Sequence, residues 1–232
     1  MVFCVASVLL AIFLGAALGN VIRGVPLGAD GYFFEPLWTD WRVGPQPGIL
    51  DWYTVMAGVI ALVTLTAHGT LYVVTKTEAE LNQRARRIAL IMWPVQALLT
   101  VVSLIATYWI KPGVMDNYRQ HSIGLLVPLL VVASLAMMLR FTRQGKEKPA
   151  FVSSGLYIVG MLVGAAFALY PVVLPASTDP SYSLTIYNSA AGRHGLTVGL
   201  TWWCIGVVLA LAYFVFIFRM FRGKVRLEGG GY

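Results

Sequence analysis

The most regular feature of the sequence is a series of long apolar runs separated by short polar segments. Each run is about 20 residues long, the length that an α-helix needs to cross the hydrocarbon layer of a bilayer. The strands of a transmembrane β-barrel would instead alternate apolar and polar positions over about ten residues. Six helices are predicted, at residues 2–21, 52–75, 88–110, 123–139, 150–174 and 196–218. The pattern thus predicts an all-α integral membrane protein, with residues 1–232 forming a single transmembrane domain of helical bundles.

The composition supports this prediction. Charged residues make up 12% of the 232 residues and hydrophobic residues 58%. A water-soluble domain carries about 25% charged residues, so most of this surface is expected to face lipid. The net charge of +7 would by itself suit a nucleic-acid-binding protein. The basic residues, however, form short clusters between apolar runs, as membrane topology requires, and nucleic acid is not expected as a partner.

The basic clusters also predict how the helices are oriented. Cytoplasmic loops of membrane proteins are enriched in Lys and Arg. Most of the 17 basic residues follow the second, fourth and sixth runs, namely Lys76, Arg84, Arg86, Arg87, Arg140, Arg143, Lys146, Lys148, Arg219, Arg222, Lys224 and Arg226. The opposite loops contain only Arg23, Arg42, Lys111, Arg119 and Arg193. We therefore predict a multi-pass protein of the cell membrane with both termini in the cytoplasm.

Residues 22–50, on the predicted exterior side, are rich in glycine, proline and aromatic residues. The aromatic side chains include Tyr32, Phe33, Phe34, Trp38 and Trp41. Such rings suit the headgroup layer of a membrane, where they form aromatic belts. The alternative interpretation is a surface that contacts a quinone, a lipid or a partner subunit.

His68 is the one residue that could carry chemistry and that lies firmly inside a predicted helix. Thr64 and Tyr72 are four residues before and after it, so the three side chains are expected to form one polar stripe. The stripe could belong to a proton path, or His68 could hydrogen-bond between helices or ligate haem iron. The pattern leaves these alternatives open, and it contains no catalytic triad, phosphate-binding loop or acidic metal-binding motif.

Several stretches together resemble subunit II of cytochrome bd-type quinol oxidases. They lie in the same order along nearly the whole chain, and they are Gly19–Leu27, Leu50–Thr54, Ala67–Tyr72, Thr77–Arg84, Pro171–Ser177, and Ser183–Thr197 followed by Trp202 and Trp203. Each stretch is short, but their combined order and spacing are specific to this family.

The resemblance implies a respiratory role that depends on a partner. In this family subunit I carries haems b and d, oxidises ubiquinol or menaquinol and reduces oxygen to water. Subunit II packs against subunit I in a heterodimer, is needed for assembly of the haem sites, and can hold a structural quinone. The haem ligands belong to subunit I, which argues against ligation by His68. We expect a non-haem-ligating subunit in a prokaryotic inner membrane, with quinol as the substrate of the complex and lipids as neighbours.

The sequence departs from the family pattern at its start. Subunit II normally has eight helices, and acidic motifs in its first part are not found here. We interpret the chain as N-terminally truncated by two helices, through a gene fragment, a misplaced start codon or a frameshift. We then expect impaired function, because small residues such as Gly15, Ala16 and Gly19 would lose their packing partners.

Two other classes of protein fit the apolar pattern. One is a small membrane transporter, although neither an inverted repeat nor a helix broken at mid-membrane is evident. The other is a structural membrane protein without a haem-bearing partner.

Overall fold

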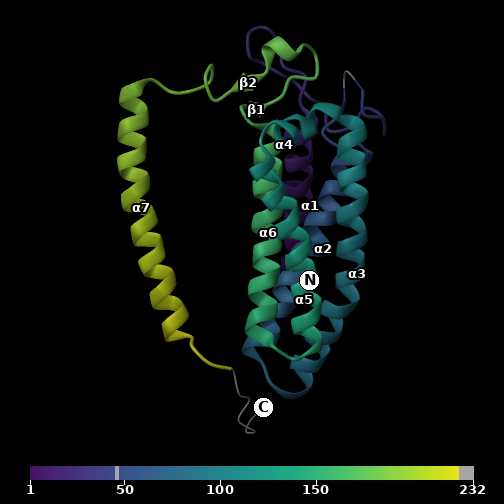
Figure 1. Cartoon of the computed structure of the whole chain (residues 1–232), viewed down its shortest axis with the longest axis vertical. Helices are drawn as coiled ribbons and strands as arrows, with labels where there is room; N and C mark the ends of the chain where they lie inside the picture. Colours follow the sequence, from purple (N-terminus) through teal and green to yellow (C-terminus); the bar gives the residue numbers. More distant parts are fainter. Residues whose placement is uncertain (45–46, 225–232) are drawn as a thin grey trace.

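The computed structural model describes residues 1–44 and 47–224 and consists mainly of long α-helices (Figure 1). Within these described ranges, six helical segments are long and apolar enough to cross a membrane. They are α1 (Val2–Arg23), α2 (Trp52–Lys76), α3 (Ala79–Ile110), η2 (Ser122–Leu125) continuing into α5 (Leu126–Arg143), α6 (Glu147–Leu169) and α7 (Arg193–Met220). The predicted class, an all-α membrane protein with six spanning helices, is confirmed. Arg226, which we placed in the third basic cluster, lies outside the described residues.

Short elements connect these helices at one end of the molecule, shown at the top of Figure 1. The single-turn helix η1 (Pro112–Met115) and α4 (Asp116–Gln120) join α3 to η2. Strand β1 (Val172–Leu174) pairs antiparallel with β2 (Leu184–Thr185), and η3 (Pro180–Tyr182) lies between them. These elements form a cap over this end of the bundle. Together with residues 24–44 and 47–50 we call it the exterior cap, after the side of the membrane that the sequence predicts for it.

Two predicted helix boundaries are wrong by five residues or more. The fifth spanning helix ends at Leu169 rather than at residue 174. Proline cannot donate a helical hydrogen bond and disfavours helix in the residue before it. Pro171 follows Tyr170, the C-cap of this helix. The third spanning helix, α3, begins at Ala79 rather than at residue 88, so its first turns contain Arg84, Arg86 and Arg87. As expected for a helical extension, Arg84 Nη2 lies 2.5 Å from Glu80 Oε1, one turn earlier.

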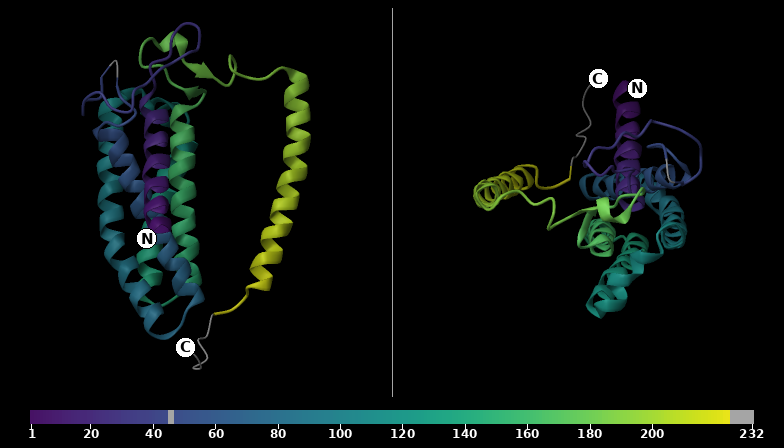
Figure 2. Two further views of the ribbon diagram at one scale, coloured as in Figure 1. Left: turned by 180° about the vertical axis from the view of Figure 1, so that it is seen from behind. Right: turned by 90° about the horizontal axis from the view of Figure 1, so that it is seen from above.

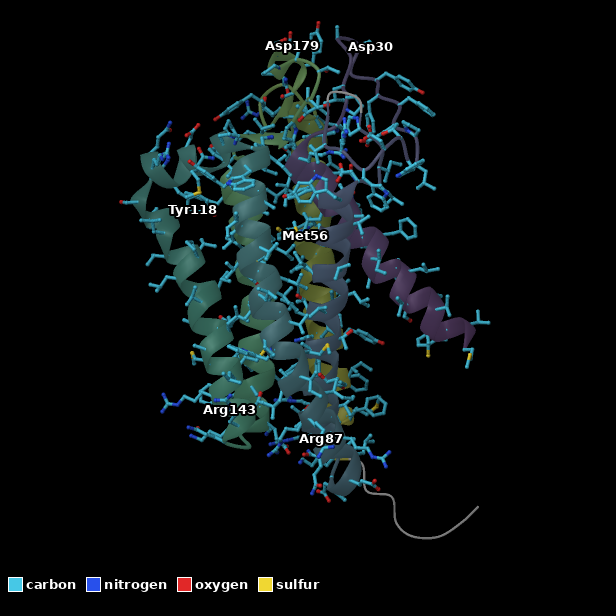
Figure 3. All side chains as sticks on the ribbon, turned by 90° about the vertical axis from the view of Figure 1, so that its right-hand side faces the viewer. Asp30, Met56, Arg87, Tyr118, Arg143 and Asp179 are labelled. Atoms are coloured by element: carbon cyan, nitrogen blue, oxygen red, sulfur yellow. The ribbon has the colours of Figure 1, made fainter. Side chains whose placement is uncertain are left out.

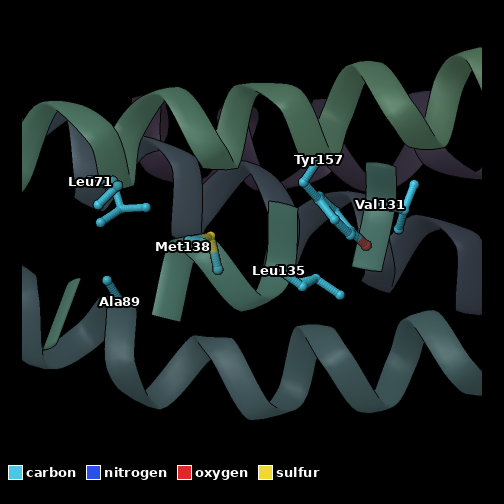
Figure 4. Close-up of a cluster of buried hydrophobic side chains, with 7 residues drawn as sticks. Leu71, Ala89, Val131, Leu135, Met138 and Tyr157 are labelled. Carbon is cyan, nitrogen blue, oxygen red and sulfur yellow. The ribbon is translucent and has the colours of Figure 1, made fainter. Parts of the chain in front are cut away.

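The helices α1, α2, α3, α5 and α6 pack into one bundle in which α2 contacts α1, α3 and α6. Buried apolar side chains at its centre come from four of these helices (Figure 4). The cluster consists of Leu71, Ala89, Val131, Leu135, Met138, Ala150 and Tyr157. It joins α2 and α3 to the hairpin formed by α5 and α6.

Small residues bring α1 and α2 into close contact. A Cβ atom on Gly15 would lie 2.6 Å from Ala61 Cβ and 2.7 Å from the Ala57 carbonyl oxygen. Gly15, Ala16 and Gly19 are all buried. The expectation that these three residues lack partners is therefore wrong, because α2 supplies the surface that they contact. Close approach through small residues is a common way for membrane helices to associate.

Helix α7 stands apart from the bundle in both views of Figure 2. None of its residues is buried. The exterior cap connects it to the bundle at one end, and two hydrogen bonds hold it at the other. Lys76 Nζ donates to the Phe221 carbonyl oxygen at 2.7 Å, and Lys224 Nζ donates to Glu147 Oε1 at 2.8 Å. An apolar helix with nothing buried along its length has its whole surface available to lipid or to another protein.

The described residues of the basic clusters lie at the end of the bundle opposite the exterior cap. Figure 3 shows Arg87 and Arg143 at one end and Asp30 and Asp179 at the other. Loops rich in Lys and Arg alternate along the sequence with loops that contain few of them, and in the structure the two kinds of loop lie at opposite ends of the bundle.

Candidate functional site

The capped end of the bundle contains a buried charged cluster around Arg23, the last residue of α1. Its guanidinium donates to the carboxylates of Asp51 and Glu35. It also donates to the Gly48 carbonyl oxygen at 3.1 Å and, at 2.5 Å, to Asn20 Oδ1. The side chains of Arg23, Asp51 and Glu35 are each at most 4% exposed. Because buried ions are stable only when paired and hydrogen-bonded, this cluster fixes Glu35, Gly48 and Asp51 against the end of α1.

Asp51 has a second role, as the N-cap of α2. Its Oδ1 atom accepts hydrogen bonds from the backbone N–H groups of Tyr53 and Thr54, both at 2.8 Å. The Thr54 hydroxyl oxygen accepts in return from the backbone N–H of Asp51 at 2.9 Å. This reciprocal capping box starts α2 and explains the Leu50–Thr54 stretch.

Glu35 titrates differently from an exposed glutamate. Burial raises the pKa of its carboxyl above the ordinary value, although the neighbouring charge of Arg23 opposes this rise. Nearby Asp51 adds to the increase in the pKa because it is a second carboxylate beside the same guanidinium. One arginine thus faces two carboxylates, and the raised pKa means that Glu35 takes up a proton more readily than an exposed glutamate does.

Two of the stretches that suggested the family meet in the exterior cap. The backbone N–H of Val25 donates to the Pro175 carbonyl oxygen at 3.0 Å, and that of Ser177 donates to the Val25 carbonyl oxygen at 2.9 Å. Gly24 allows this contact, since its φ of 101° is unfavourable for other residues and a Cβ would lie 3.0 Å from the Pro175 carbonyl oxygen. The segment after α1 and the segment after α6 therefore form one unit.

Within the membrane-spanning part, His68 links α2 to α6. Its Nδ1 atom lies 2.7 Å from Ser154 Oγ, and its ring stacks on Phe151 with centroids 4.6 Å apart. The hydroxyl of Ser154 donates its one proton to the Phe151 carbonyl oxygen at 2.7 Å. Because that proton is already donated, the Ser154 oxygen can accept, which favours the tautomer in which His68 Nδ1 carries the hydrogen and donates to it.

The other two members of the predicted stripe have different surroundings. Thr64 is buried, and its hydroxyl has no hydrogen-bond partner among the described residues. Tyr72 is 40% exposed and contacts Phe151, with ring centroids 5.6 Å apart. The structure therefore brings His68 and Tyr72 together on Phe151 and places Thr64 in the bundle interior.

Polar groups that the sequence analysis did not single out also lie inside the bundle. The hydroxyls of Thr100 and Tyr157 are 2.6 Å apart, joining α3 to α6. Gln96 Oε1 and Ser134 Oγ, like the Thr64 hydroxyl, are buried without a hydrogen-bond partner among the described residues. Unpaired polar atoms inside a bundle are costly, and ordered water usually satisfies them. Single polar residues within apolar runs were the only sequence signal for these groups.

Among the residues described, no group of three or more His, Cys, Asp or Glu side chains could hold a metal ion. The aromatic side chains in the exterior cap, including Tyr32, Phe34, Trp38 and Trp41, are exposed. That exposure fits both interpretations of the segment, a headgroup belt and a contact surface.

Comparison with known proteins gives consistent matches. Residues 1–221 match the family described as cytochrome bd terminal oxidase subunit II. The chain is 25% identical over 240 residues to the "Probable cytochrome oxidase subunit 2" of Haemophilus influenzae, and 26% identical over 253 residues to the "Cytochrome bd-I ubiquinol oxidase subunit 2" of Escherichia coli. Each alignment covers 93% of this chain and 62% of the relative. The "Cytochrome bd ubiquinol oxidase subunit 2" of Bacillus subtilis is 25% identical over 190 residues, which cover 80% of this chain and 51% of that protein. The chain thus spans less than two thirds of the length of these relatives.

Proposed function

The chain belongs to the cytochrome bd terminal oxidase subunit II family, and we propose from this that it acts as the accessory subunit of a quinol oxidase in a bacterial inner membrane. In the proposed complex, subunit I holds haems b and d, oxidises quinol and reduces oxygen to water. This chain supports the fold and the haem sites of subunit I, contributes no haem ligand, and has no catalytic centre of its own.

The observation that carries the proposal is the isolation of α7. A spanning helix normally buries one side against neighbouring helices, through van der Waals packing and interhelical hydrogen bonds. None of the residues of α7 is buried in this chain, although it is tethered to the bundle at both ends. We assign its free surface to contact with subunit I. If the chain were a transporter or a structural membrane protein, something other than subunit I would have to cover this surface of α7.

A native cysteine makes this contact testable. Cys204 is an exposed free cysteine on α7, and Cys4 is an exposed free cysteine on α1. When the chain is expressed with subunit I, a short membrane-permeant thiol-to-amine cross-linker should join the two proteins through Cys204. The Cys204→Ala variant should lose this product and the Cys4→Ala variant should keep it. A product that survives Cys204→Ala would place the contact elsewhere.

We propose an interhelical role for His68. Support comes from its Nδ1 hydrogen bond to Ser154 and its stacking on Phe151, which together hold the ring between α2 and α6. A proton path through Thr64, His68 and Tyr72 is the competing role, favoured by the unpartnered hydroxyl of buried Thr64. The two roles predict different effects of the same substitutions, as described below.

The proposed orientation places both termini and the basic clusters in the cytoplasm. Asp179 and Gln83 are exposed residues at opposite ends of the molecule. In a background without Cys4 and Cys204, a membrane-impermeant thiol reagent should label Asp179→Cys on intact spheroplasts, and Gln83→Cys only after lysis. The reverse pattern would invert the orientation.

A structural quinone is a further part of the proposal, supported by family membership and by the exposed aromatic side chains of the exterior cap. Solvent extraction of the purified complex should yield more quinone than subunit I alone retains. Equal amounts of quinone in both preparations would show that this chain does not hold a structural quinone.

A further inference from the structure

An open pocket of about 620 Å³ lies at the end of the bundle that carries the basic clusters. Most of its wall is one face of the first turns of α3, with Asn82, Arg86, Arg87 and Leu90. Glu147 at the start of α6 and Lys224 after α7 complete it. Arg87 is labelled at this end in Figure 3.

The charged side chains that line the pocket differ in how many ion-pair and hydrogen-bond partners they have. Glu147 accepts hydrogen bonds from Asn82 Nδ2 and Lys224 Nζ, both at 2.8 Å, and lies 3.8 Å from Arg86 Nη2. Its carboxylate is therefore compensated within the protein. Glu78 also lines the pocket. In contrast, Arg87 is exposed and forms no ion pair with another described residue. Among the described residues, the pocket thus offers one guanidinium without an ion pair, from Arg87, and a second, from Arg86, whose nearest carboxylate oxygen is 3.8 Å away.

The inner edge of the pocket continues into an apolar track. Beyond Leu90, several exposed large apolar residues of α3 recur every three or four positions, at Ile91, Val95, Leu98, Val102 and Ile105, and Val101 and Leu104 are exposed beside them. This spacing places them on one side of the helix. The track runs from the pocket into the part of α3 that spans the membrane.

From this combination we propose that the pocket binds an anionic phospholipid. Arginine guanidinium groups bind phosphate oxygens in a bidentate manner, and basic pockets between membrane helices commonly hold anionic headgroups. The phosphate lies against Arg86 and Arg87 with Lys224 nearby, and an acyl chain follows the apolar track along α3. A free phosphate would satisfy the arginines but would leave the track unused, which is why a lipid is the better fit.

The test uses the full chain, purified together with any partner that accompanies it. Binding of dioleoylphosphatidylglycerol and of dioleoylphosphatidylcholine is measured by native mass spectrometry in a mild detergent. We expect a clear preference for the anionic lipid. Each arginine near an anionic headgroup contributes about a fivefold gain in affinity, so Arg87→Gln should weaken binding about fivefold and Arg86→Gln with Arg87→Gln by about 25-fold.

The matched control is Arg140→Gln with Arg143→Gln, which removes the same charge from two exposed arginines in the last turn of α5. Arg143 is labelled at the same end of the bundle as Arg87 in Figure 3. This variant should bind the anionic lipid as the unmodified chain does. An equal loss in both double variants would mean general attraction by a basic surface and would overturn the proposal. Because Arg87 forms no ion pair with a described residue, Arg87→Gln should unfold at an unchanged temperature. If the double variant misfolds, this single variant alone shows whether the pocket arginines bind the lipid.

Two soluble competitors separate the lipid from a free anion. Inorganic phosphate and glycerophosphoglycerol, the deacylated headgroup, should fail to displace bound phosphatidylglycerol at millimolar concentrations. If either one binds as tightly as the lipid, the pocket is a site for a soluble phosphate, and the lipid proposal is wrong.

Discussion

The guanidinium of Arg23, at the end of α1, donates to the carboxylate of Asp51, at the start of α2, and both side chains are buried. The pair closes the connection between two neighbouring helices at the exterior end. Asp51 also starts α2 as its N-cap, so one carboxylate serves both the charge pair and the helix.

Asp51 should therefore tolerate asparagine better than alanine. The Asp51→Ala change removes the cap and leaves Arg23 with Glu35 as its one carboxylate partner, which should cost about 3–5 kcal/mol of stability. An asparagine side-chain oxygen can still accept from the N–H groups of Tyr53 and Thr54, so Asp51→Asn should cost less. Thermal unfolding in detergent measures both changes. Equal losses would show that the cap contributes little.

Glu35 should make the stability of the exterior cap depend on pH. Its pKa is raised in the folded protein, so the folded state binds a proton more readily than the unfolded state. Its contribution to stability is then fully present below the unfolded pKa, and it is lost as the pH rises through the higher folded pKa. The unfolding temperature of the unmodified chain relative to Glu35→Gln should rise as the pH is lowered from 7 towards 4.5, the ordinary value. A flat difference between the two proteins would contradict the raised pKa.

The contact between α1 and α2 should be sensitive to one added methyl group. A Cβ on Gly15 would lie 2.6 Å from Ala61 Cβ and 2.7 Å from a backbone oxygen, so Gly15→Ala requires the helices to move apart. We expect a loss of about 1–3 kcal/mol, as is typical for overpacking. Gly206 on α7 is the control, because a Cβ there would have nothing within 4 Å. If Gly206→Ala destabilises the protein as much, close packing at Gly15 is not the cause.

His68 should tolerate glutamine if it connects helices. The side-chain amide of His68→Gln can still donate to Ser154, whereas His68→Leu cannot. Assembly of the proposed oxidase and the rate at which it oxidises quinol should then survive in His68→Gln and fall in His68→Leu. If His68 instead transfers protons, His68→Gln should assemble normally yet oxidise quinol slowly, because an amide does not titrate. Haem content and oxygen consumption, measured on the same preparation, separate the two outcomes.

The spanning helices were predictable because hydrophobic length alone decides whether a segment crosses a membrane. Their ends were harder to predict. The charged first turns of α3 look like a loop in a hydropathy pattern, although Ala79–Arg87 continues the same helix. At the other boundary, Pro171 carried a clear local signal for the end of α6, but the apolar residues after it, which form β1, masked that signal.

The charged cluster could not be predicted, because its members are brought together by the chain rather than by spacing. Arg23 and Asp51 are separated by 28 positions, and Arg23 was counted among the exterior loop charges. His68 and Thr64 were identified because they are polar within an apolar run. Their partner, Ser154, lies 86 residues after His68, and no helical period links the two. Likewise, the sequence does not predict that α7 stands apart from the bundle, because its hydropathy is similar to that of the packed helices.

The most direct test of the proposed function is a reduced-minus-oxidised visible spectrum of the complex purified through this chain. The chain carries a tag after Tyr232 and is expressed with subunit I in a host that lacks its own cytochrome bd. We predict that subunit I copurifies and that the spectrum contains the bands of haems b and d, which should be weaker when subunit I is expressed alone. A purified chain without haem bands, or a subunit I spectrum that is the same with and without this chain, would contradict the assignment as an accessory subunit.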